Sequence, residues 1–234
     1  MPEAVCVRIL SAGAPKTGVR LCAEAYTAAA GIPHAIEFAT GPVIKERVTA
    51  GKAAADLVVA PSPAMEGFVD ARMITADSVF RIGSVTAGVT VRNGAEDPDI
   101  SSLAAFREAL MDADALVYNQ ASSGQYIATM VEKIGIADQV ADKTVRVPSG
   151  AAVMETIAAD QRQRVIGFGQ ITEIRLHEHL GVHLVGPLPA EIGKVTTYSA
   201  GLSTTAEHAE AAGALLAFMA SDEGQQIFAE TGVE

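Results

Sequence analysis

Segments rich in glycine and hydroxyl residues follow several apolar stretches of the chain, and they hold its candidate ligand-binding residues. Glycine lets a backbone approach a ligand closely, and unpaired N–H groups and hydroxyls can donate hydrogen bonds to an anion. The residues expected to bind the ligand are Gly13, Ala14, Lys16, Thr40, Gly41, Ser122, Ser123, Ser149, Gly150 and Gln170. This pattern predicts a site for a small anion, held mainly by neutral donors.

Each of these segments could also be an ordinary turn or helix start. Ser122 with Gln125 fits a capping box, in which both side chains satisfy the helix N-terminus instead of a ligand. For any single segment this structural interpretation is the better one. Six such segments at the ends of expected strands favour a common ligand site: residues 11–16, 39–42, 61–63, 119–124, 148–151 and 169–172.

Four side chains near these segments have the chemistry of a proton donor or acceptor. They are Lys16, Tyr118, Tyr126 and Glu173, and no pair among them has a spacing that dictates contact. Lys16 is the only cation within the six segments, where it would offer a point charge to a carboxylate or phosphate. Arg146 lies inside a short expected strand, where it could equally pair with an acidic residue.

Sequence motifs for metals and nucleotide cofactors are weak or missing. His177, His179 and His183 could suggest a metal, but Gly181 interrupts the helix, so a solvated helix end is favoured. The sequence contains no GxSxG, GxGxxG after the first strand, Walker A, HExxH or CxxC pattern. Neither a metal nor a cofactor is therefore expected.

The charge of the chain constrains its partners. With 17 basic and 28 acidic residues, the formal net charge is −11, which opposes binding to nucleic acid or to an anionic membrane surface. An anionic ligand must then be held by local dipoles or by a few placed cations. The two cysteines, Cys6 in an expected strand and Cys22 in an expected helix, look like small core residues.

The periodicity of apolar residues predicts an α/β architecture. Short β-branched runs are expected to be buried strands at residues 5–10, 36–38, 57–60, 115–118, 144–147 and 165–168. Between the first two, Val19, Cys22, Ala23 and Tyr26 have helical spacing, and Gly31 ends the helix. Further helices are expected near residues 127–134, 149–159 and 212–219. Strands that alternate with helices predict parallel sheets, at whose carboxyl ends ligands bind.

Two longer β-prone stretches predict two lobes. Residues 81–92 read as a crossover strand into a second lobe, and residues 195–202 as the returning strand. The expected division is residues 1–82 plus 197–234 for the first lobe and residues 83–196 for the second, with the ligand cleft between them.

The beginning of the chain bears on its location. MPEAVCVRIL lacks the features of a secretory signal, and no apolar run approaches the roughly 20 residues of a transmembrane helix. Cytoplasmic location is therefore expected, or periplasmic location if a leader was removed. No membrane insertion and no transporter partner are expected.

Three stretches resemble one family. Residues 212–234 (AGALLAFMASDEGQQIFAETGVE), residues 165–174 (VIGFGQITEI) and residues 50–61 (AGKAAADLVVAP) are similar to type II periplasmic solute-binding proteins of the molybdate-binding kind. The resemblance implies a two-lobe α/β fold, each lobe a mostly parallel sheet flanked by helices, joined by two hinge strands. It also implies an anion bound between the lobes.

The chain departs from the molybdate binders of this family in its first two loops. Those proteins usually place serines there, whereas this chain has none at residues 12–15 and 39–42 and adds Lys16. This favours a di- or tricarboxylate over molybdate. Because relatives of the family include enzymes resembling aconitate isomerase, a cofactor-independent isomerase that moves a proton on an unsaturated carboxylate is the alternative.

Overall fold

The computed structural model describes residues 5–234, in which strands and helices alternate along the chain. The chain divides into two compact units: Met1–Val85 with Thr196–Glu234 forms unit 1, and Thr86–Val195 forms unit 2. Two long strands, β4 (Phe80–Arg92) and β9 (Val195–Leu202), carry the chain from one unit to the other. Both coincide with the stretches that the sequence marks as crossover and return strands.

The sheet of unit 1 has strands in the order β2 (His34–Ala39), β1 (Val7–Ala12), β3 (Leu57–Pro61) and β9. β1 pairs in parallel with both β2 and β3, whereas β9 is antiparallel to β3. The carboxyl ends of β1, β2 and β3 therefore share one edge. The helices that follow these strands begin at the same edge.

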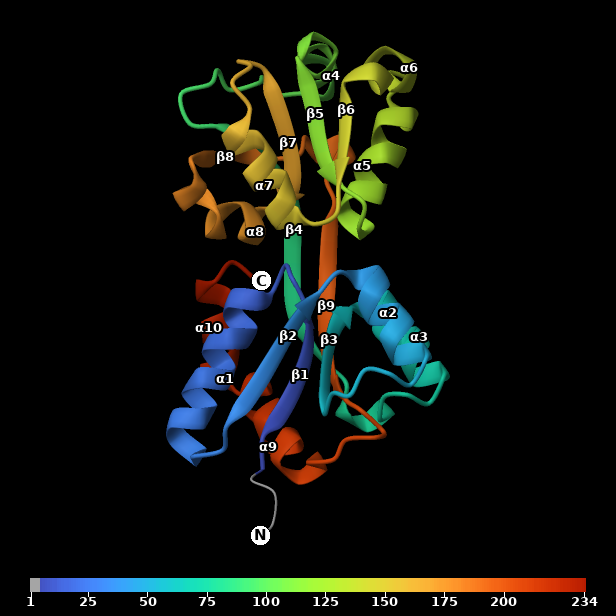
Figure 1. The fold of residues 1–234 in the computed structure, drawn as a ribbon, viewed down its shortest axis with the longest axis vertical. Helices are drawn as coiled ribbons and strands as arrows, with labels where there is room; N and C mark the ends of the chain where they lie inside the picture. The colour runs from blue at the N-terminus through green and yellow to red at the C-terminus, as the bar shows by residue number, and fades with distance from the viewer. Residues whose placement is uncertain (1–4) are drawn as a thin grey trace. The chain divides into compact units, whose positions relative to one another are not determined.

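Helices cover both faces of this sheet (Figure 1). α1 (Lys16–Ala30), α9 (Ala209–Ala220) and α10 (Asp222–Glu230) pack together on one side, and α2 (Gly41–Thr49) and α3 (Ser62–Asp70) lie on the other. α1 buries Val19, Cys22 and Ala23 and ends at Gly31, whose φ of 71° favours glycine. The helical periodicity of this segment thus produces the expected buried face.

Unit 2 has its own sheet. β5 (Ala115–Asn119) lies between β6 (Thr144–Val147) and β7 (Val165–Gln170) and is parallel to both. β4 pairs antiparallel with β7 and with β8 (Val182–Pro187). The three parallel strands again bring their carboxyl ends to one edge.

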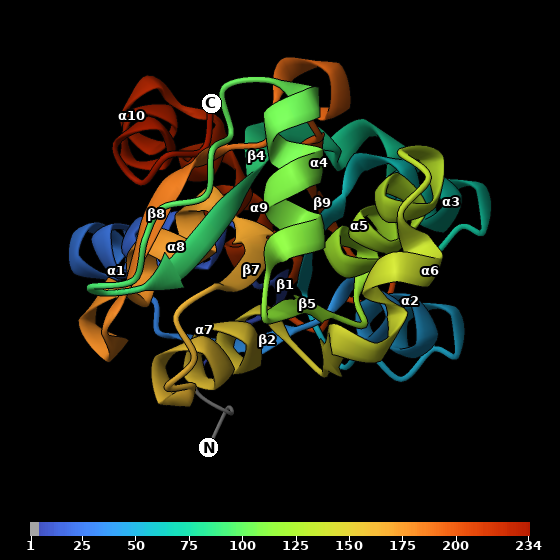
Figure 2. The same cartoon turned by 90° about the horizontal axis from the view of Figure 1, so that it is seen from above.

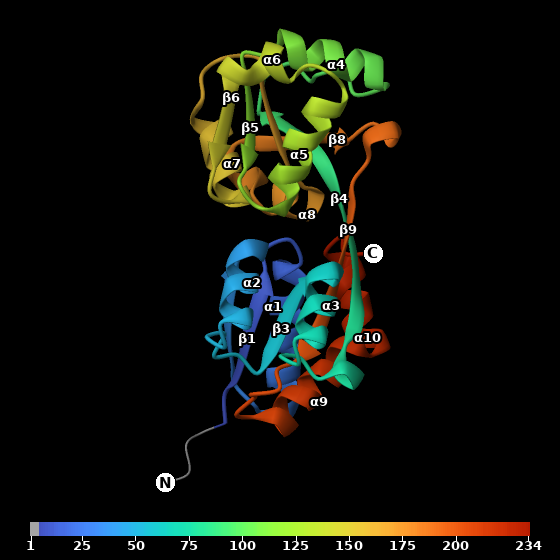
Figure 3. The ribbon, with the colours of Figure 1, turned by 90° about the vertical axis from the view of Figure 1, so that its right-hand side faces the viewer.

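The faces of this second sheet are covered by different helices. Figure 3 shows α5 (Ser122–Lys133) on one side of β5 and β6 and α7 (Gly150–Ala159) on the other. α4 (Leu103–Asp112) and α6 (Ala137–Val140) belong to the α5 side, where Figure 2 shows α4 lengthwise, and α8 (Ile171–Leu176) packs with α7. Four 3-10 helices complete the chain: Ala76–Ser78, Ala141–Lys143, Glu178–Leu180 and Ala190–Ile192.

The predicted α/β class and the parallel strands are confirmed, but several boundaries differ. β1 begins at Val7 and runs to Ala12, so Ser11 and Ala12, expected in a loop, are paired with β2. β7 likewise extends to Gln170. Backbone pairing continues past the last apolar side chain because ladder hydrogen bonds need no apolar residue. The residue pattern did not predict α2, α3, α4 and β8.

A buried carboxylate joins three segments of unit 1. Asp56, just before β3, is buried and accepts hydrogen bonds from the amides of Arg8 (2.9 Å), Glu207 (2.8 Å) and His208 (3.1 Å). The Arg8 guanidinium Nε lies 3.7 Å from the same carboxylate. Burial raises the pKa of Asp56, but the amides and Arg8 outweigh it, so that the pKa lies below its usual range.

The cysteines are free thiols. Cys22 is buried in α1 as expected, whereas Cys6 precedes β1 and is partly exposed. Burial, with a contribution from the nearby Glu223, raises the pKa of Cys22 to about 12. Among residues 5–234, every helix is too short or too polar to cross a bilayer.

Candidate functional site

In unit 1, the register of two neighbouring strands brings the first candidate residues to one edge. Ala12 of β1 lies opposite Ala39 of β2, so Gly13 and Thr40 each follow one residue beyond the paired strand ends. Ala14, Lys16 and Gly41 come next, at the first turns of α1 and α2. The structure therefore places these five candidates at the same edge of the sheet.

The first turns of α1 and α2 leave several hydrogen-bond donors without a protein acceptor. In α1, the amide of Lys16 donates to Gly13 O (3.2 Å), but those of Thr17 and Gly18 have no acceptor within residues 5–234. In α2, the amides of Gly41 and Val43 likewise have no acceptor within residues 5–234, and the Thr40 hydroxyl makes no capping hydrogen bond. Such donors, at the positive end of a helix, suit an anion.

Lys16 adds a positive charge to this edge. It is the first residue of α1, its side chain is partly exposed, and it takes part in no ion pair within the described part of the chain. Arg47, in the last turn of α2, pairs instead with Glu37 of β2. Lys16 therefore keeps its charge available to a ligand.

In unit 2, the candidates gather at the carboxyl ends of β5, β6 and β7. Asn119 of β5 lies opposite Val147 of β6, and β7 ends at Gln170, which is buried. Ser122 and Ser123 open α5, Ser149 and Gly150 open α7, and Gln170 precedes α8. All five candidates of this unit therefore share one edge of its sheet.

Asn119, within the candidate segment 119–124, shapes the start of α5. Its Oδ1 accepts from the amides of Ala121 (2.9 Å) and Gly124 (3.1 Å), and its Nδ2 donates to the Ser123 hydroxyl (3.0 Å). A Cβ at Gly124 would overlap the Asn119 carbonyl, so only glycine fits there. Asn119 thus occupies the place of a capping residue.

The capping-box interpretation of Ser122 is wrong. Ser122 lies inside the first turn of α5, whose N-cap is Ala121, and Gln125 donates instead to Gln120 O (3.4 Å). Asn119 satisfies the amide of Gly124, which leaves those of Ser122 and Ser123 without an acceptor among residues 5–234. Ser149, by contrast, is an N-cap and accepts from the Ala152 amide (3.2 Å).

Arg146 is a site candidate that the sequence analysis left open. It lies opposite Tyr118 in the β5–β6 pair, and its guanidinium carbon is 4.6 Å from the centroid of the Tyr118 ring. Nη2 donates to the Asn119 carbonyl (3.3 Å), and Arg146 takes part in no ion pair within the described residues. The acidic partner considered for it is not found. Its register beside Tyr118 could have suggested the contact, but the sequence does not reveal strand register.

The other proton-transfer candidates differ in how they are held. The Tyr126 hydroxyl donates to Ile192 O (2.9 Å), and Lys194 Nζ lies 5.5 Å from its ring centroid. Tyr118 is buried beneath Arg146. Glu173, in the first turn of α8, lies against Gly150: a Cβ there would overlap its carboxylate. The Glu173 carboxylate therefore lies at the start of α7.

The histidines near the end of α8 have other contacts. His177 caps α8 through Nδ1 and Glu173 O (2.7 Å), and His183 Nε2 lies 2.7 Å from Asp97. α8 ends at Leu176, and Gly181 has a φ of 94°. Within residues 5–234, no group of three or more acidic, histidine or cysteine side chains is arranged to hold a metal ion.

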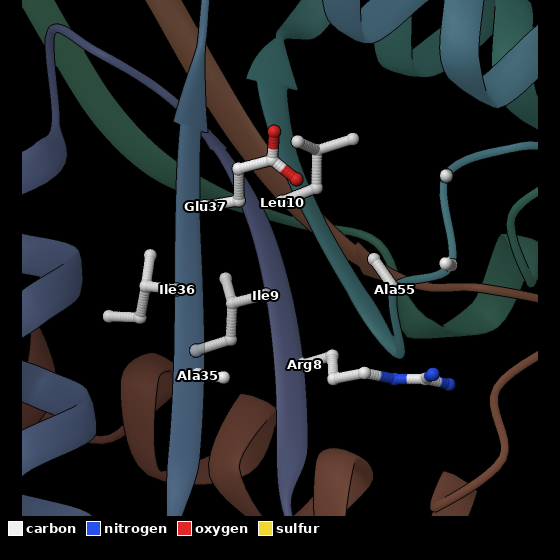
Figure 4. A pocket seen from close by; sticks show the side chains of 9 residues that line it. Arg8, Ile9, Leu10, Ala35, Ile36, Glu37 and Ala55 are labelled. Carbon is white, nitrogen blue, oxygen red and sulfur yellow. The ribbon is translucent and has the colours of Figure 1, made fainter.

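One pocket of unit 1 lies away from these strand ends (Figure 4). It has a volume of about 220 Å³ and is lined by Arg8, Ile9, Leu10, Ala35, Ile36, Glu37, Ala53, Ala54 and Ala55. Arg8 points away from Glu37, toward the loop that carries Ala55, and pairs with Asp56 and Glu207. Because both charged side chains of the pocket have partners, it offers little to an anion.

Comparison with known proteins identifies a family and a relative of this chain. The family model of the bacterial extracellular solute-binding proteins matches residues 7–234. A protein named aconitate isomerase, from a Pseudomonas species, is 29% identical over 231 residues, which are 97% of this chain and 86% of that protein.

Two solved structures show the same fold. One is the periplasmic molybdate-binding protein of Azotobacter vinelandii, with a TM-score of 0.78, 12% identity and coverage of 97% of this chain and 98% of that chain. The other is the sulfate-binding protein SubI of Mycobacterium tuberculosis H37Rv, with a TM-score of 0.78, 18% identity and coverage of 98% and 86%. The expected type II periplasmic-binding-protein fold is confirmed, and this chain belongs to the family of bacterial extracellular solute-binding proteins.

Proposed function

We propose that this protein binds a small di- or tricarboxylate through the loops at the carboxyl ends of its strands. The candidate donors of unit 1 are Lys16, the Thr40 hydroxyl and the free amides of α1 and α2. The candidate donors of unit 2 are the first turn of α5, the loop before α7, and Arg146. The net charge of −11 makes such short-range donors necessary, because the overall field repels an anion.

Arg146 is the observation that carries the carboxylate assignment. A guanidinium presents N–H groups in a planar fork that matches a carboxylate, and it remains charged at any physiological pH. In this chain the guanidinium rests on Tyr118 and the Asn119 carbonyl, with no acidic partner among residues 5–234. A cation held in place but not neutralised is suited to a ligand carboxylate.

Lys16 and the first two loops support the same ligand class. Residues 12–15 and 39–42 lack the serines with which molybdate binders of this family usually coordinate a tetrahedral oxyanion. Lys16 and Arg146 are each suited to a carboxylate. Molybdate is therefore the less favoured ligand.

Thermal unfolding with a panel of anions tests this assignment. We expect cis-aconitate, trans-aconitate and citrate to raise the melting temperature, because a ligand that binds only the folded state stabilises it. Molybdate, tungstate and sulfate at the same ionic strength should raise it little. Stabilisation by molybdate or tungstate without stabilisation by any carboxylate would contradict the proposal.

A second candidate function is isomerisation of an unsaturated tricarboxylate. The relative named aconitate isomerase, similar along 97% of this chain, favours it. The two candidates share a ligand class and differ only in whether a proton is moved on the bound ligand. In this reaction the donors described above would also stabilise the enolate-like charge that develops.

Proton NMR in deuterated water distinguishes the two functions. An isomerase converts cis-aconitate and trans-aconitate into each other or exchanges their methylene protons for deuterium. A binding protein is stabilised against thermal unfolding by the same ligands, but it leaves both of their spectra unchanged over hours.

A further inference from the structure

The carboxylate of Glu173 lies against the backbone at the start of α7. A Cβ built on Gly150 would overlap Cδ and both carboxylate oxygens of Glu173, so any side chain at position 150 would displace this carboxylate. Gly150 is buried, and it is the first residue of α7 after the N-cap Ser149. The sequence thus provides a glycine where Glu173 needs space.

Two neighbouring elements fix this placement. Glu173 is three residues beyond Gln170, the last residue of β7, and Gly150 is three residues beyond Val147, the last residue of β6. His177 Nδ1 lies 2.7 Å from the carbonyl oxygen of Glu173, which steadies the short helix α8. The carboxylate therefore stands at the same edge as the ligand-binding candidates of unit 2.

A carboxylate at this position is unfavourable for a protein that only binds anions. The partial positive charge at the start of α7 attracts a carboxylate such as that of Glu173. The negative charge of a carboxylate at this position repels a ligand carboxylate. A proton-transfer enzyme, however, needs a base at its ligand, and an ionised carboxylate is one.

We propose that Glu173 is the catalytic residue that moves the proton in the isomerase reaction, an inference that rests on that second candidate function. Its carboxylate takes H⁺ from the CH₂ group of an unsaturated tricarboxylate. The electron pair of the broken C–H bond spreads over the adjacent C=C bond and its carboxylate. The protonated Glu173 then returns H⁺ to the far carbon of the former double bond. The double bond moves by one position, without oxidation and without a co-reactant.

The test compares turnover and binding of aconitate in matched variants. Glu173→Gln removes the base but keeps the shape of the side chain, and Gly150→Ala displaces the carboxylate but keeps its charge. Glu178→Gln, at an exposed glutamate just after α8, controls for loss of one negative charge. Gly213→Ala controls for the glycine substitution, because a Cβ there meets nothing within 4 Å.

We expect Glu173→Gln to lower kcat for aconitate by about 100-fold or more, as loss of a general base does. Its Kd for trans-aconitate by calorimetry should stay within about threefold of wild type or decrease, since a like charge is removed. Gly150→Ala should lower kcat by about tenfold or more. Both control variants should retain wild-type turnover.

Three results would overturn the inference, in distinguishable ways. If the wild type turns over aconitate and Glu173→Gln does so within about threefold of it, the isomerase function stands and Glu173 is not its base. If Glu173→Gln lowers the melting temperature but leaves kcat unchanged, the carboxylate only caps a helix. If the wild type binds aconitate but moves no proton, the isomerase function fails, and this role of Glu173 with it. Should Glu173→Gln fail to fold, Gly150→Ala decides, and wild-type turnover in that variant would contradict the inference.

Discussion

The guanidinium of Arg146 lies over the ring of Tyr118, with 4.6 Å between the guanidinium carbon and the ring centroid. The two residues are register partners on β6 and β5, so the strands place their side chains next to each other. A cation held above an aromatic ring loses little conformational freedom when a ligand arrives. Arg146 is therefore the residue by which we expect carboxylates to be recognised.

Removing Arg146 should weaken carboxylate binding. We expect Arg146→Ala to raise the Kd for trans-aconitate by about 10–100-fold, since a hydrogen bond to a charged group contributes about 1.5–3 kcal/mol. Arg146→Lys should recover only part of this affinity, because an ammonium cannot form the planar fork. Titration calorimetry measures both.

The matched control for Arg146 is Lys133→Ala. Lys133 is exposed in the last turn of α5, so its loss changes the net charge equally but lies at the opposite end of that helix. Its Kd should stay within about threefold of wild type. Equal weakening by Arg146→Ala and Lys133→Ala would show a general charge effect and would count against a specific contact.

Asp56 should be a major determinant of the stability of unit 1. Asp56→Asn removes the charge that three amides and Arg8 surround, and it turns at least one acceptor into a donor. We expect the free energy of unfolding to fall by about 2–4 kcal/mol, measured by urea denaturation. Asp77→Asn, at an exposed aspartate, should change it by less than about 0.5 kcal/mol. A similar loss in both variants would mean that the buried network contributes little.

Asp56 also predicts how stability depends on pH. Its folded-state pKa lies below the value of about 3.9 for an unfolded aspartate, so folding favours the ionised form. This contribution is complete above about pH 5, one unit above the unfolded-state pKa, and is lost as the pH falls through the lower folded-state pKa. The free energy of unfolding should therefore decrease between pH 5 and pH 3, and the decrease should be smaller in Asp56→Asn. If the free energy of unfolding falls equally with pH in both proteins, the lowered pKa of Asp56 is refuted.

The two thiols should differ in reactivity. The pKa of Cys22 is raised to about 12 by burial and Glu223, so almost no thiolate exists at pH 8, whereas Cys6 is partly exposed. A disulfide reagent should therefore label Cys6 quickly in the native protein and Cys22 only on unfolding. Cys6→Ser should remove the fast phase, and a fast phase that persists in this variant would show that Cys22 is accessible.

The sequence predicts the elements better than it predicts the contacts between them. Periodicity identifies α1 and the strands around it because burial of one face requires apolar residues such as Val19 and Cys22 at fixed spacing. It also gives the candidate edges, since parallel strands bring their carboxyl ends together. It does not reveal β8, because a partly exposed strand at the side of a sheet shows only weak alternation.

The contacts that define the site depend on residues far apart in the chain. Arg146 meets Tyr118 only through the register of β5 and β6, and Glu173 meets Gly150 only because α8 packs with α7. Ser122 carries the pattern of a capping residue, yet Asn119 takes that role because the turn begins earlier. Local sequence patterns contain no information about such pairings.

Titration calorimetry of the wild-type protein with trans-aconitate and, separately, with molybdate tests the central proposal most directly. At equal ionic strength, we expect trans-aconitate to bind with a Kd at least tenfold lower than that of molybdate, because the planar guanidinium of Arg146 matches a carboxylate. Tighter binding of molybdate, or no heat from trans-aconitate where molybdate saturates the protein, would contradict the assignment of a carboxylate ligand.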